Sequence, residues 1–326
     1  MSTPLLDIND LKVYYPIYGG GFFKKKIENL KAVDGVNLKI DRGEVIGLVG
    51  ESGCGKSTVA RSVMCLTETT SGSIKLEGAE LNRLTSKELK IKRPEFQMIF
   101  QDPFSSLNPR MTVFSILAEP LLYHGLVKKS DLTDALSTLL SEVGLSPRDM
   151  GKYPHEFSGG QLQRIAIARA LSLRPKLIIA DEPVSALDVS IRSQILNLLV
   201  RLIKEHSLTM LFISHDLSVI RHISDRIAVM YLGKIVETGS NEQVYSHPAH
   251  PYTRALLSAV PVPDPDQEKA RKRVMLEGEP PSPINPPGGC SFHPRCRYRK
   301  ERCSIETPCL ESKGDNHSVA CFYPLD

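Results

Sequence analysis

Residues 50–58 read GESGCGKST, and this stretch decides the fold. It fits the phosphate-binding pattern G-x-x-x-x-G-K-[ST], it follows an apolar segment, EVIGLV, and it opens a helical stretch, TVARSVMCL. Glycines let successive backbone N–H groups point at a phosphate, and the helix N-terminus adds the positive end of its dipole. The alternative is a chance glycine-rich turn, which the flanking strand and helix argue against. We predict a P-loop in which Lys56 reaches the outer phosphates and Ser57 binds Mg²⁺.

An acidic pair follows a second apolar segment further along the chain. Residues 176–183 read KLIIADEP, so Asp181 and Glu182 stand at the end of a predicted strand. Such a pair is commonly just solvated, but an upstream P-loop favours a catalytic interpretation. Asp181 is then expected to hold Mg²⁺ through water, and Glu182 to polarise the water that attacks the γ-phosphate.

The rest of the chain alternates between the two periodicities. Residues 1–60 have the alternation of strands, with an exposed hairpin-like insertion in PIYGGGFFKKKIENLKAV. Residues 110–150 show helical spacing, and residues 151–240 alternate helix with strand. This alternation predicts an α/β fold with a largely parallel sheet. The proline-rich residues 261–289 are expected to be a linker or an extended wrap.

Composition restricts the class of protein. The chain has 326 residues, 41% hydrophobic and 24% charged, and a net charge of +4, which is too mild to argue for a nucleic-acid partner. The N-terminus has no secretory signal pattern, and no apolar run approaches the roughly 20 residues of a membrane span. We therefore expect a cytoplasmic location, where disulfides are rare and clustered cysteines more often bind metal or do redox chemistry.

The stretch FSGGQLQRIAIARAL, residues 157–171, narrows the family. It resembles the signature of the ATP-binding-cassette (ABC) family, normally LSGGQ, with Phe157 at the apolar first position. Other landmarks resemble the family in the same order: Gln101 in MIFQDP, SALD at residues 185–188, and His215 in LFISHD. The resemblance spans residues 5–260. It implies a P-loop NTPase cassette over residues 1–260 with a helical subdomain at about residues 102–170.

The resemblance also implies roles for the site residues. SGGQ precedes a helix, so Ser158 and the amides of its glycines make a second anion site, which in the family serves the ATP of a facing subunit. Two chains head to tail then enclose two nucleotides. His215 orients the γ-phosphate and water, Asp188 communicates across the interface, and Tyr15 stacks on adenine unless the following insertion supplies that ring. Cys54 contributes its backbone only.

The predicted site is therefore a defined set of residues. The catalytic residues are Lys56, Gln101, Glu182 and His215. The Mg²⁺ ligands are Ser57, Gln101 and Asp181. The ATP-binding residues are Tyr15, Gly50, Glu51, Ser52, Gly53, Cys54, Gly55, Lys56, Ser57, Thr58, Gln101, Ser158, Gly159, Gly160, Gln161, Asp181 and Asp188.

The C-terminal residues 261–326 contain five of the seven cysteines. SHPAHPYTRALLSAVP at 246–261, followed by CSFHPRC, resembles the C-terminal extension of dipeptide and oligopeptide importer ATPases. The resemblance implies that Cys290, Cys296, Cys303 and Cys321 hold a [4Fe–4S] cluster, as thiolates commonly do. Cys309 lies outside the pattern and is left as a spare or substitute ligand. Zinc is the rival, disfavoured because no tight C-x₂₋₄-C pair is present, and free thiols are a third possibility.

The resemblance implies a bacterial peptide-importer ATPase, and QDPFSSLNPRMTV at residues 101–113 is similar to the version in such ATPases. Its expected partners are two membrane permease subunits, a paralogous ATPase subunit or a second copy of this chain, and indirectly an external substrate-binding protein. Its expected place is the cytoplasmic face of the inner membrane, as a peripheral protein. Alternatives are a nickel or oligosaccharide importer, or a soluble ABC ATPase acting on nucleic acid or ribosomes. A kinase has no reason to carry SGGQ and SALD.

Overall fold

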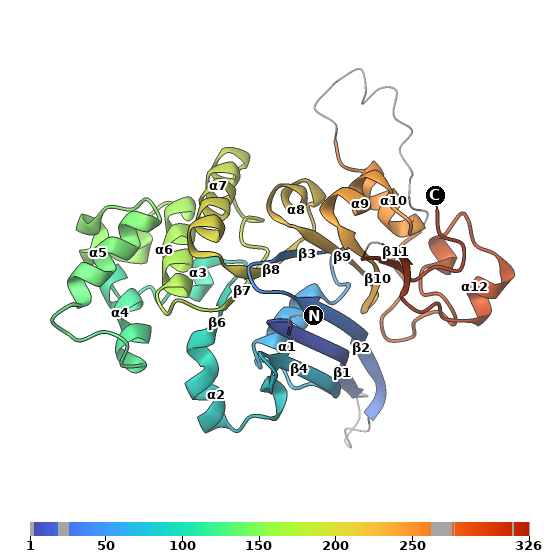
Figure 1. Cartoon of the computed structure of the whole chain (residues 1–326), viewed down its shortest axis with the longest axis horizontal. Coiled ribbons are helices and arrows are strands. Elements are labelled where there is room, and N and C mark those ends of the chain that lie inside the picture. Colours follow the sequence, from blue (N-terminus) through green and yellow to red (C-terminus); the bar gives the residue numbers. More distant parts are fainter. Residues whose placement is uncertain (1–2, 19–25, 262–275, 277, 315, 326) are drawn as a thin grey trace. The chain divides into compact units, whose positions relative to one another are not determined.

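The structure, a computed structural model, describes residues 3–18, 26–261, 276, 278–314 and 316–325 (Figure 1). The chain divides into two compact units. Unit 1 comprises Met1–Asp41, Val45–Arg83 and Ser214–Asp326, and unit 2 comprises Arg42–Glu44 and Leu84–Ile213. The P-loop and the cysteines near the C-terminus therefore belong to the same unit, although more than 200 residues of sequence separate them.

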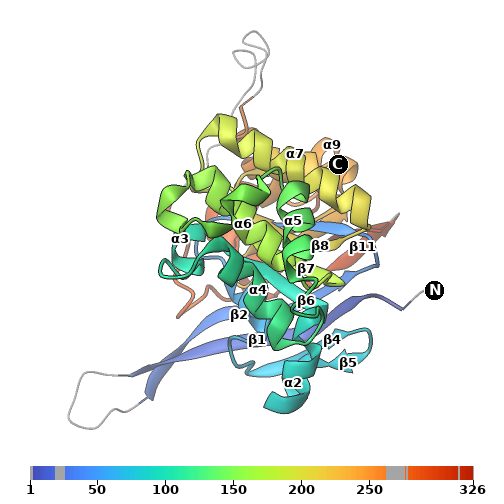
Figure 2. The same cartoon turned by 90° about the vertical axis from the view of Figure 1, so that its left-hand side faces the viewer.

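Unit 1 contains an antiparallel sheet with the strand order β2-β1-β4-β5. Its strands are β1 (Leu6–Tyr18), β2 (Lys26–Ile40), β4 (Ser71–Leu76) and β5 (Ala79–Glu80). Along β1, Leu6 and Ile8 and then Leu11 and Val13 are buried, so the alternation of a sheet with one covered face holds on either side of a register shift between Ile8 and Leu11. β1 and β2 pair antiparallel as far as Tyr18 and Lys26 and form a long ribbon in Figure 2. The predicted hairpin-like arrangement is thus confirmed, although its tip lies outside the described residues.

A second group of strands in unit 1 carries the P-loop. β3 (Val45–Val49) pairs parallel with β9 (Arg226–Tyr231), and β9 pairs antiparallel with β10 (Lys234–Ser240). The C-terminal strands β12 (His317–Val319) and β11 (Glu311–Gly314) extend this sheet beyond β10. The end of the chain is therefore built into the sheet that presents the P-loop.

Short helices of unit 1 flank these strands. They are α1 (Lys56–Val63), α8 (Leu217–Ile223), α9 (Asn241–Ser246), α10 (Pro251–Ser258) and α12 (Glu301–Ile305). Helix α8 packs closely against β3, since a Cβ at Gly47 would lie 2.5 Å from a methyl carbon of Ile220. The described part of the predicted proline-rich wrap, residues 278–289, contains no helix or strand.

Unit 2 combines parallel strands with helices. β6 (Phe96–Ile99), β7 (Leu177–Asp181) and β8 (Thr209–Ser214) pair in parallel, which confirms the predicted sheet type. The helices are α2 (Ser86–Lys92), α3 (Pro103–Ser106), α4 (Val113–Tyr123), α5 (Leu132–Glu142), α6 (Gly159–Leu171) and α7 (Val189–His206). Helices α4 and α5 confirm the helical spacing seen over residues 110–150. Figure 2 shows α6 among α3, α4, α5 and α7. The exact bounds of a helical subdomain stay a prediction.

Among the helices in the described ranges, none combines the length and the apolar character that crossing a bilayer requires.

Candidate functional site

The P-loop joins β3 to α1 through backbone that only glycine adopts without strain. Gly50, Gly53 and Gly55 all have positive φ, and a Cβ at Gly55 would lie 2.1 Å from the carbonyl oxygen of Ala32. Gly55 is also the N-cap of α1, and it offers no side-chain cap to the helix. The first turn of α1 therefore keeps the amide-lined N-terminus that suits an anion.

Lys56 lies within this loop. Its side chain is buried, and its ammonium donates hydrogen bonds to the carbonyl oxygens of Gly50 (2.8 Å) and Glu51 (3.0 Å). The positive charge is thereby held beside the backbone amides on which phosphate is expected to bind. Burial raises the pKa of the neighbouring Cys54 thiol, which keeps it protonated and uncharged. This fits the prediction that Cys54 contributes backbone alone.

Glu51 has two partners that the sequence analysis missed. Its amide donates to the hydroxyl of Tyr252 at 2.9 Å, and its carboxylate forms a two-pronged ion pair with the guanidinium of Arg295 at 2.9 and 3.2 Å. Tyr252 is the second residue of α10, whereas Arg295 lies between two of the C-terminal cysteines. Both appear in the quoted motifs, but no spacing rule links them to a P-loop.

In unit 2, the structure brings Gln101 and Glu182 together. The amide of Gln101 donates to a carboxylate oxygen of Glu182 at 3.3 Å. Glu182 has a φ of 46°, an uncommon conformation for a residue other than glycine, and its amide donates to Ile213 of β8 at 3.0 Å. Asp181, at the end of β7, is buried. The strand end thus holds two adjacent carboxylates in different surroundings, one buried and one beside Gln101.

The signature residues begin α6. Ser158 is its N-cap: the amide of Gln161 donates to the Ser158 hydroxyl at 3.4 Å, and the amide of Ser158 donates to the Gln161 side chain at 3.0 Å. Both residues are exposed. A Cβ at Gly160 would lie 2.5 Å from a methyl carbon of Ile191, so this glycine lets α6 approach α7 closely. Asp188, the N-cap residue of α7, is also exposed.

Two further predicted residues, Tyr15 and His215, are exposed as well, whereas Ser57 and Thr58 at the start of α1 are half-buried. Tyr15 of β1 is 40% exposed, which leaves its ring open to stack on a base. His215 is exposed just after β8. Unit 1 thus carries the P-loop, Tyr15 and His215, and unit 2 carries Gln101, Ser158, Asp181, Glu182 and Asp188. Their assembly into one catalytic site stays a prediction.

We call residues 290–314 and 316–325 the cysteine module. Cys290, Cys296, Cys303 and Cys321 line one small cavity, together with aromatic and histidine side chains. Cys309 is exposed and lines a different cavity. All seven cysteines of the chain lie in the described residues, and none forms a disulfide. Four thiols that share a cavity match the donor type of a thiolate-bound cluster.

Burial favours the neutral form of three of the thiols in this cavity. Burial raises the pKa values of Cys290 and Cys296, and it raises that of Cys321 to about 11. Metal binding would therefore release protons. Within the described ranges, no three His, Cys, Asp or Glu side chains are arranged closely enough to hold a metal ion as they stand. The thiols match a cluster in ligand type, but they would have to move closer together to bind one.

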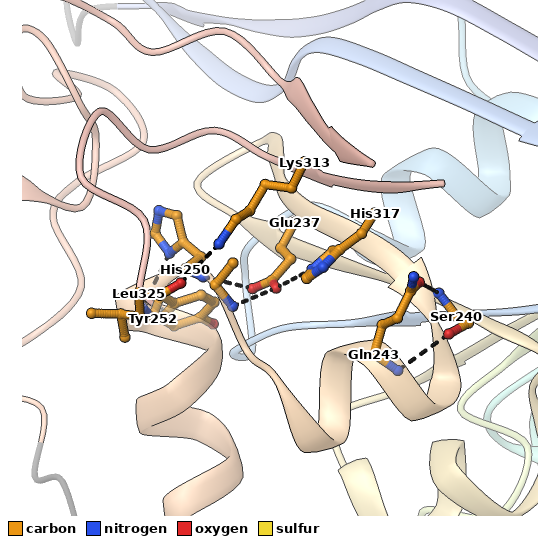
Figure 3. A network of polar contacts seen from close by, with 9 residues as sticks. Glu237, Ser240, Gln243, His250, Tyr252, Lys313, His317 and Leu325 are labelled. Atoms are coloured by element: carbon orange, nitrogen blue, oxygen red, sulfur yellow. Dashed lines mark hydrogen bonds and ion pairs between the residues drawn. The ribbon is translucent and has the colours of Figure 1, made fainter. Parts of the chain in front are cut away.

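A buried glutamate fixes the cysteine module to β10 (Figure 3). Glu237 is fully buried, and its carboxylate accepts hydrogen bonds from the amides of Ala249 (2.7 Å) and His250 (2.9 Å) and pairs with the ring of His317 on β12 (2.7 Å). Burial lowers the pKa of His250 to about 4, so its ring is neutral, and its Nδ1 accepts the amide hydrogen of Tyr252 at 3.1 Å. The start of α10 and the last strand therefore depend on one carboxylate.

Comparison with known proteins shows which families and which individual proteins the chain resembles. A family model described as ABC transporter matches residues 33–185, and one described as the C-terminal region of oligopeptide/dipeptide transporters matches residues 236–303. The chain is 53% identical to the oligopeptide transport ATP-binding protein OppF of Salmonella typhimurium, over 98% of this chain and 96% of that protein. It is 51% identical to AppF of Bacillus subtilis, over 97% and 96%, and 47% identical to the dipeptide transport ATP-binding protein DppF of Haemophilus influenzae, over 99% and 97%.

Solved structures also resemble the chain. A dimeric ATP-binding cassette in a post-hydrolysis state, bound to ADP and Pi, matches with a TM-score of 0.64 and 30% identity, over 72% of this chain and 98% of that one. The protein cbiO1 of Clostridium perfringens, part of an ABC transporter complex, matches with a TM-score of 0.63 and 26% identity, over 76% and 92%. The predicted α/β cassette fold is confirmed.

Proposed function

Because the chain belongs to the ATP-binding proteins of the ABC transporter family, we propose that it hydrolyses ATP to drive peptide uptake through separate permease subunits. The C-terminal region matched at residues 236–303 carries the peptide assignment, because its family model describes oligopeptide/dipeptide transporters. The identity of 47% to 53% with peptide-transport ATP-binding proteins, over nearly the full length of the chain, supports the peptide assignment. Nickel or an oligosaccharide is the alternative cargo.

The P-loop supplies the first half of the proposed ATP site. The amides of residues 50–58 and the N-terminus of α1 bind the β- and γ-phosphates, and Lys56 adds a positive charge at the same place. Tyr15 stacks on the adenine. Ser57, Gln101 and Asp181 would hold Mg²⁺, which neutralises charge on the phosphates.

Glu182 is the proposed general base. Its contact with Gln101 and the hydrogen bond from its backbone to β8 fix the carboxylate at the strand end, where it can accept a proton from the attacking water. His215 orients that water and the γ-phosphate. Gln101 can position Glu182 in addition to its role toward Mg²⁺, because the two side chains are within 3.3 Å.

Two protomers complete each site in this proposal. Ser158, Gly159, Gly160 and Gln161 of one protomer bind the γ-phosphate of ATP on the other, with Asp188 at the same interface. The similar cassette solved as a dimer supports this arrangement. Enclosure between protomers excludes water and strengthens the electrostatic stabilisation of the transferring phosphoryl group. The second protomer is a paralogue or another copy of this chain.

Uptake further requires a pair of membrane permeases and, indirectly, an external substrate-binding protein. The protein then works at the cytoplasmic face of the inner membrane as a peripheral subunit. The decisive test is co-expression with candidate permeases, followed by ATPase assays with binding protein and peptide. Peptide-stimulated hydrolysis supports the proposal. Stimulation by nickel or oligosaccharide alone assigns another cargo, and co-purification with nucleic acid in place of permeases contradicts transport.

For the cysteine module, we infer that Cys290, Cys296, Cys303 and Cys321 hold a [4Fe–4S] cluster. Their shared cavity supports it, and the separate position of Cys309 makes that residue dispensable. The test is iron analysis and visible absorbance of anaerobically purified protein. Cys296→Ser should lose iron, whereas Cys309→Ser should retain it. Stoichiometric zinc without iron in the unmodified protein would contradict the cluster.

A further inference from the structure

Arg295 of the cysteine module makes direct contact with the P-loop. Arg295 lies between Cys290 and Cys296, and its guanidinium meets both carboxylate oxygens of Glu51, the second residue of the P-loop, at 2.9 and 3.2 Å. The Arg295 side chain is 7% exposed and that of Glu51 is 24% exposed. A two-pronged pair with this little exposure is geometrically specific, unlike a surface ion pair.

A second connection runs in parallel through aromatic rings. Tyr252 accepts the amide hydrogen of Glu51, and its ring packs against Phe292 of the cysteine module at a centroid distance of 5.4 Å. Tyr231, at the end of β9, contacts both rings at 4.7 and 5.3 Å. The segment 290–296 therefore holds Glu51 in two ways: Arg295 pairs with its side chain, and Phe292 packs against the tyrosine that binds its backbone amide.

Charge gives this contact a consequence for the nucleotide. A carboxylate within a phosphate-binding loop repels the phosphates that the loop receives. Arg295 neutralises that carboxylate, and by holding Glu51 it also fixes the backbone whose carbonyl accepts from Lys56. Without the guanidinium, Glu51 would be a half-buried charge with no counter-ion, free to turn toward the phosphates.

We propose that Arg295 is a positioning residue of the P-loop, through which the folded state of the cysteine module sets the nucleotide affinity of the cassette. Linkage makes the effect reciprocal, so nucleotide binding also stabilises the segment 290–303. The proposal requires ATP binding alone. It applies whether the thiols hold iron, hold zinc or stay free, and whatever the cargo is.

The experiment compares Arg295→Gln with Arg302→Gln in the full-length chain. Arg302 belongs to the same module and pairs with Glu306 at 2.9 Å, but this pair is more than half exposed and lies within α12 and its C-terminal end. The probe is the slowly hydrolysed ATP analogue adenylyl imidodiphosphate with Mg²⁺, and its dissociation constant is measured by calorimetry. We expect roughly a tenfold loss of affinity for Arg295→Gln and less than a twofold change for Arg302→Gln.

A double-mutant cycle shows whether the effect passes through Glu51. In a Glu51→Gln background, Arg295→Gln should weaken binding far less than it does in the unmodified chain. An equal loss in both backgrounds, or unchanged affinity for Arg295→Gln, would overturn the proposal. If Arg295→Gln does not fold, Arg295→Lys provides the test. Lysine keeps the positive charge but cannot make the two-pronged contact with Glu51. Unchanged affinity of this variant would show that the contact does not position Glu51, and would contradict the proposal.

Hydrogen exchange measures the reciprocal effect without any activity assay. The amide of Cys290 donates to the carbonyl of Cys303 at 2.8 Å, so exchange across residues 290–303 reports on the order of the module. The Mg²⁺–analogue complex should slow this exchange in the unmodified chain and in Arg302→Gln, but not in Arg295→Gln. Equal slowing in all three proteins would show that the nucleotide acts by another route. Failure of the unmodified chain to bind the analogue would instead contradict the proposed ATP site.

Discussion

Glycines lie at the N-terminus of α1 and at the N-terminus of α6, yet the two helix ends are completed differently. At α1, the N-cap is Gly55, which supplies no side-chain cap, and the buried Lys56 lies within the loop. At α6, Ser158 and Gln161 cap each other's amides at the surface of the protein. The N-terminus of α1 therefore has uncapped backbone amides with a cation nearby, whereas the N-terminus of α6 is capped by the side chains of its own first turn.

This difference indicates an order of events. The P-loop can bind phosphate within one protomer, because its positive charge and its uncapped helix end are already in place. In the proposed dimer, the signature helix would exchange the Ser158–Gln161 cap for a partner's phosphate. The exchange costs a hydrogen-bonded cap and is favourable only when a highly charged ligand arrives. We therefore expect the first site to bind nucleotide alone and the second to act only in the closed dimer.

The largest expected effect comes from Glu182→Gln, which separates binding from turnover. The amide keeps the size of the side chain but cannot accept the proton of the attacking water, so hydrolysis should fall roughly 10³-fold. ATP affinity should stay within a few-fold. Size-exclusion chromatography with Mg²⁺–ATP should then show a trapped dimer, the state in which we propose that α6 binds phosphate. Hydrolysis at the original rate would show that Glu182 is not the base.

Lys56→Ala tests whether the P-loop alone carries nucleotide binding. The change removes a buried ammonium from the phosphate site, and we expect roughly a 100-fold loss of ATP affinity in the isolated chain. Equilibrium titration of the monomer with a fluorescent ATP analogue measures it. Lys204→Ala, in the last turn of α7, is the matched control and should bind as the unmodified chain does. Equal affinity of both variants would place the main phosphate contacts elsewhere.

Acid should lower the free energy of unfolding of the protein through His250, the buried N-cap residue of α10. The pKa of His250 is lowered to about 4 in the folded protein, against about 6.5 in the unfolded chain, so below pH 6.5 the unfolded chain binds more protons. Stability is therefore lost as the pH falls from 6.5 toward 4, by about 1.4 kcal/mol for the first full pH unit below 6.5 at most. Urea unfolding at pH 7 and 5.5, with His250→Asn as reference, measures the loss. An equal pH effect in both proteins would exclude His250 as its cause.

The sequence predicted the local features of this chain well. The P-loop between a strand and a helix and the helices within residues 110–150 follow from short-range patterns, because neighbouring residues determine them. The pairing of Glu51 with Arg295 joins residues 244 positions apart, and no periodicity reports such a contact. Strand β12 has only three residues, too few for an alternating pattern, so its addition to β10 was equally hidden.

The capping box at α6 is a case in which the signal was present in the sequence. Ser158 followed three residues later by Gln161 is the pattern of mutually capping side chains. We interpreted the same residues only as an anion site, because the resemblance to the signature motif suggested a ligand. In the structure these atoms cap the helix. Their use as an anion site stays a prediction that concerns the same atoms.

The smallest expected effect is that of Ser158→Ala on the isolated chain, and it separates these two uses of the serine. The hydroxyl accepts from Gln161 at 3.4 Å on an exposed helix end, so its loss should lower the free energy of unfolding by only about 0.5 kcal/mol. Nucleotide affinity of the monomer should not change, since the P-loop is intact. In a dimerising assembly, the same variant should hydrolyse ATP more slowly. Ser158→Thr keeps the hydroxyl and serves as the control for both measurements. A Ser158→Ala monomer that binds ATP more weakly would show that α6 contributes to the first site as well, and the contrast between the two helix ends would no longer hold.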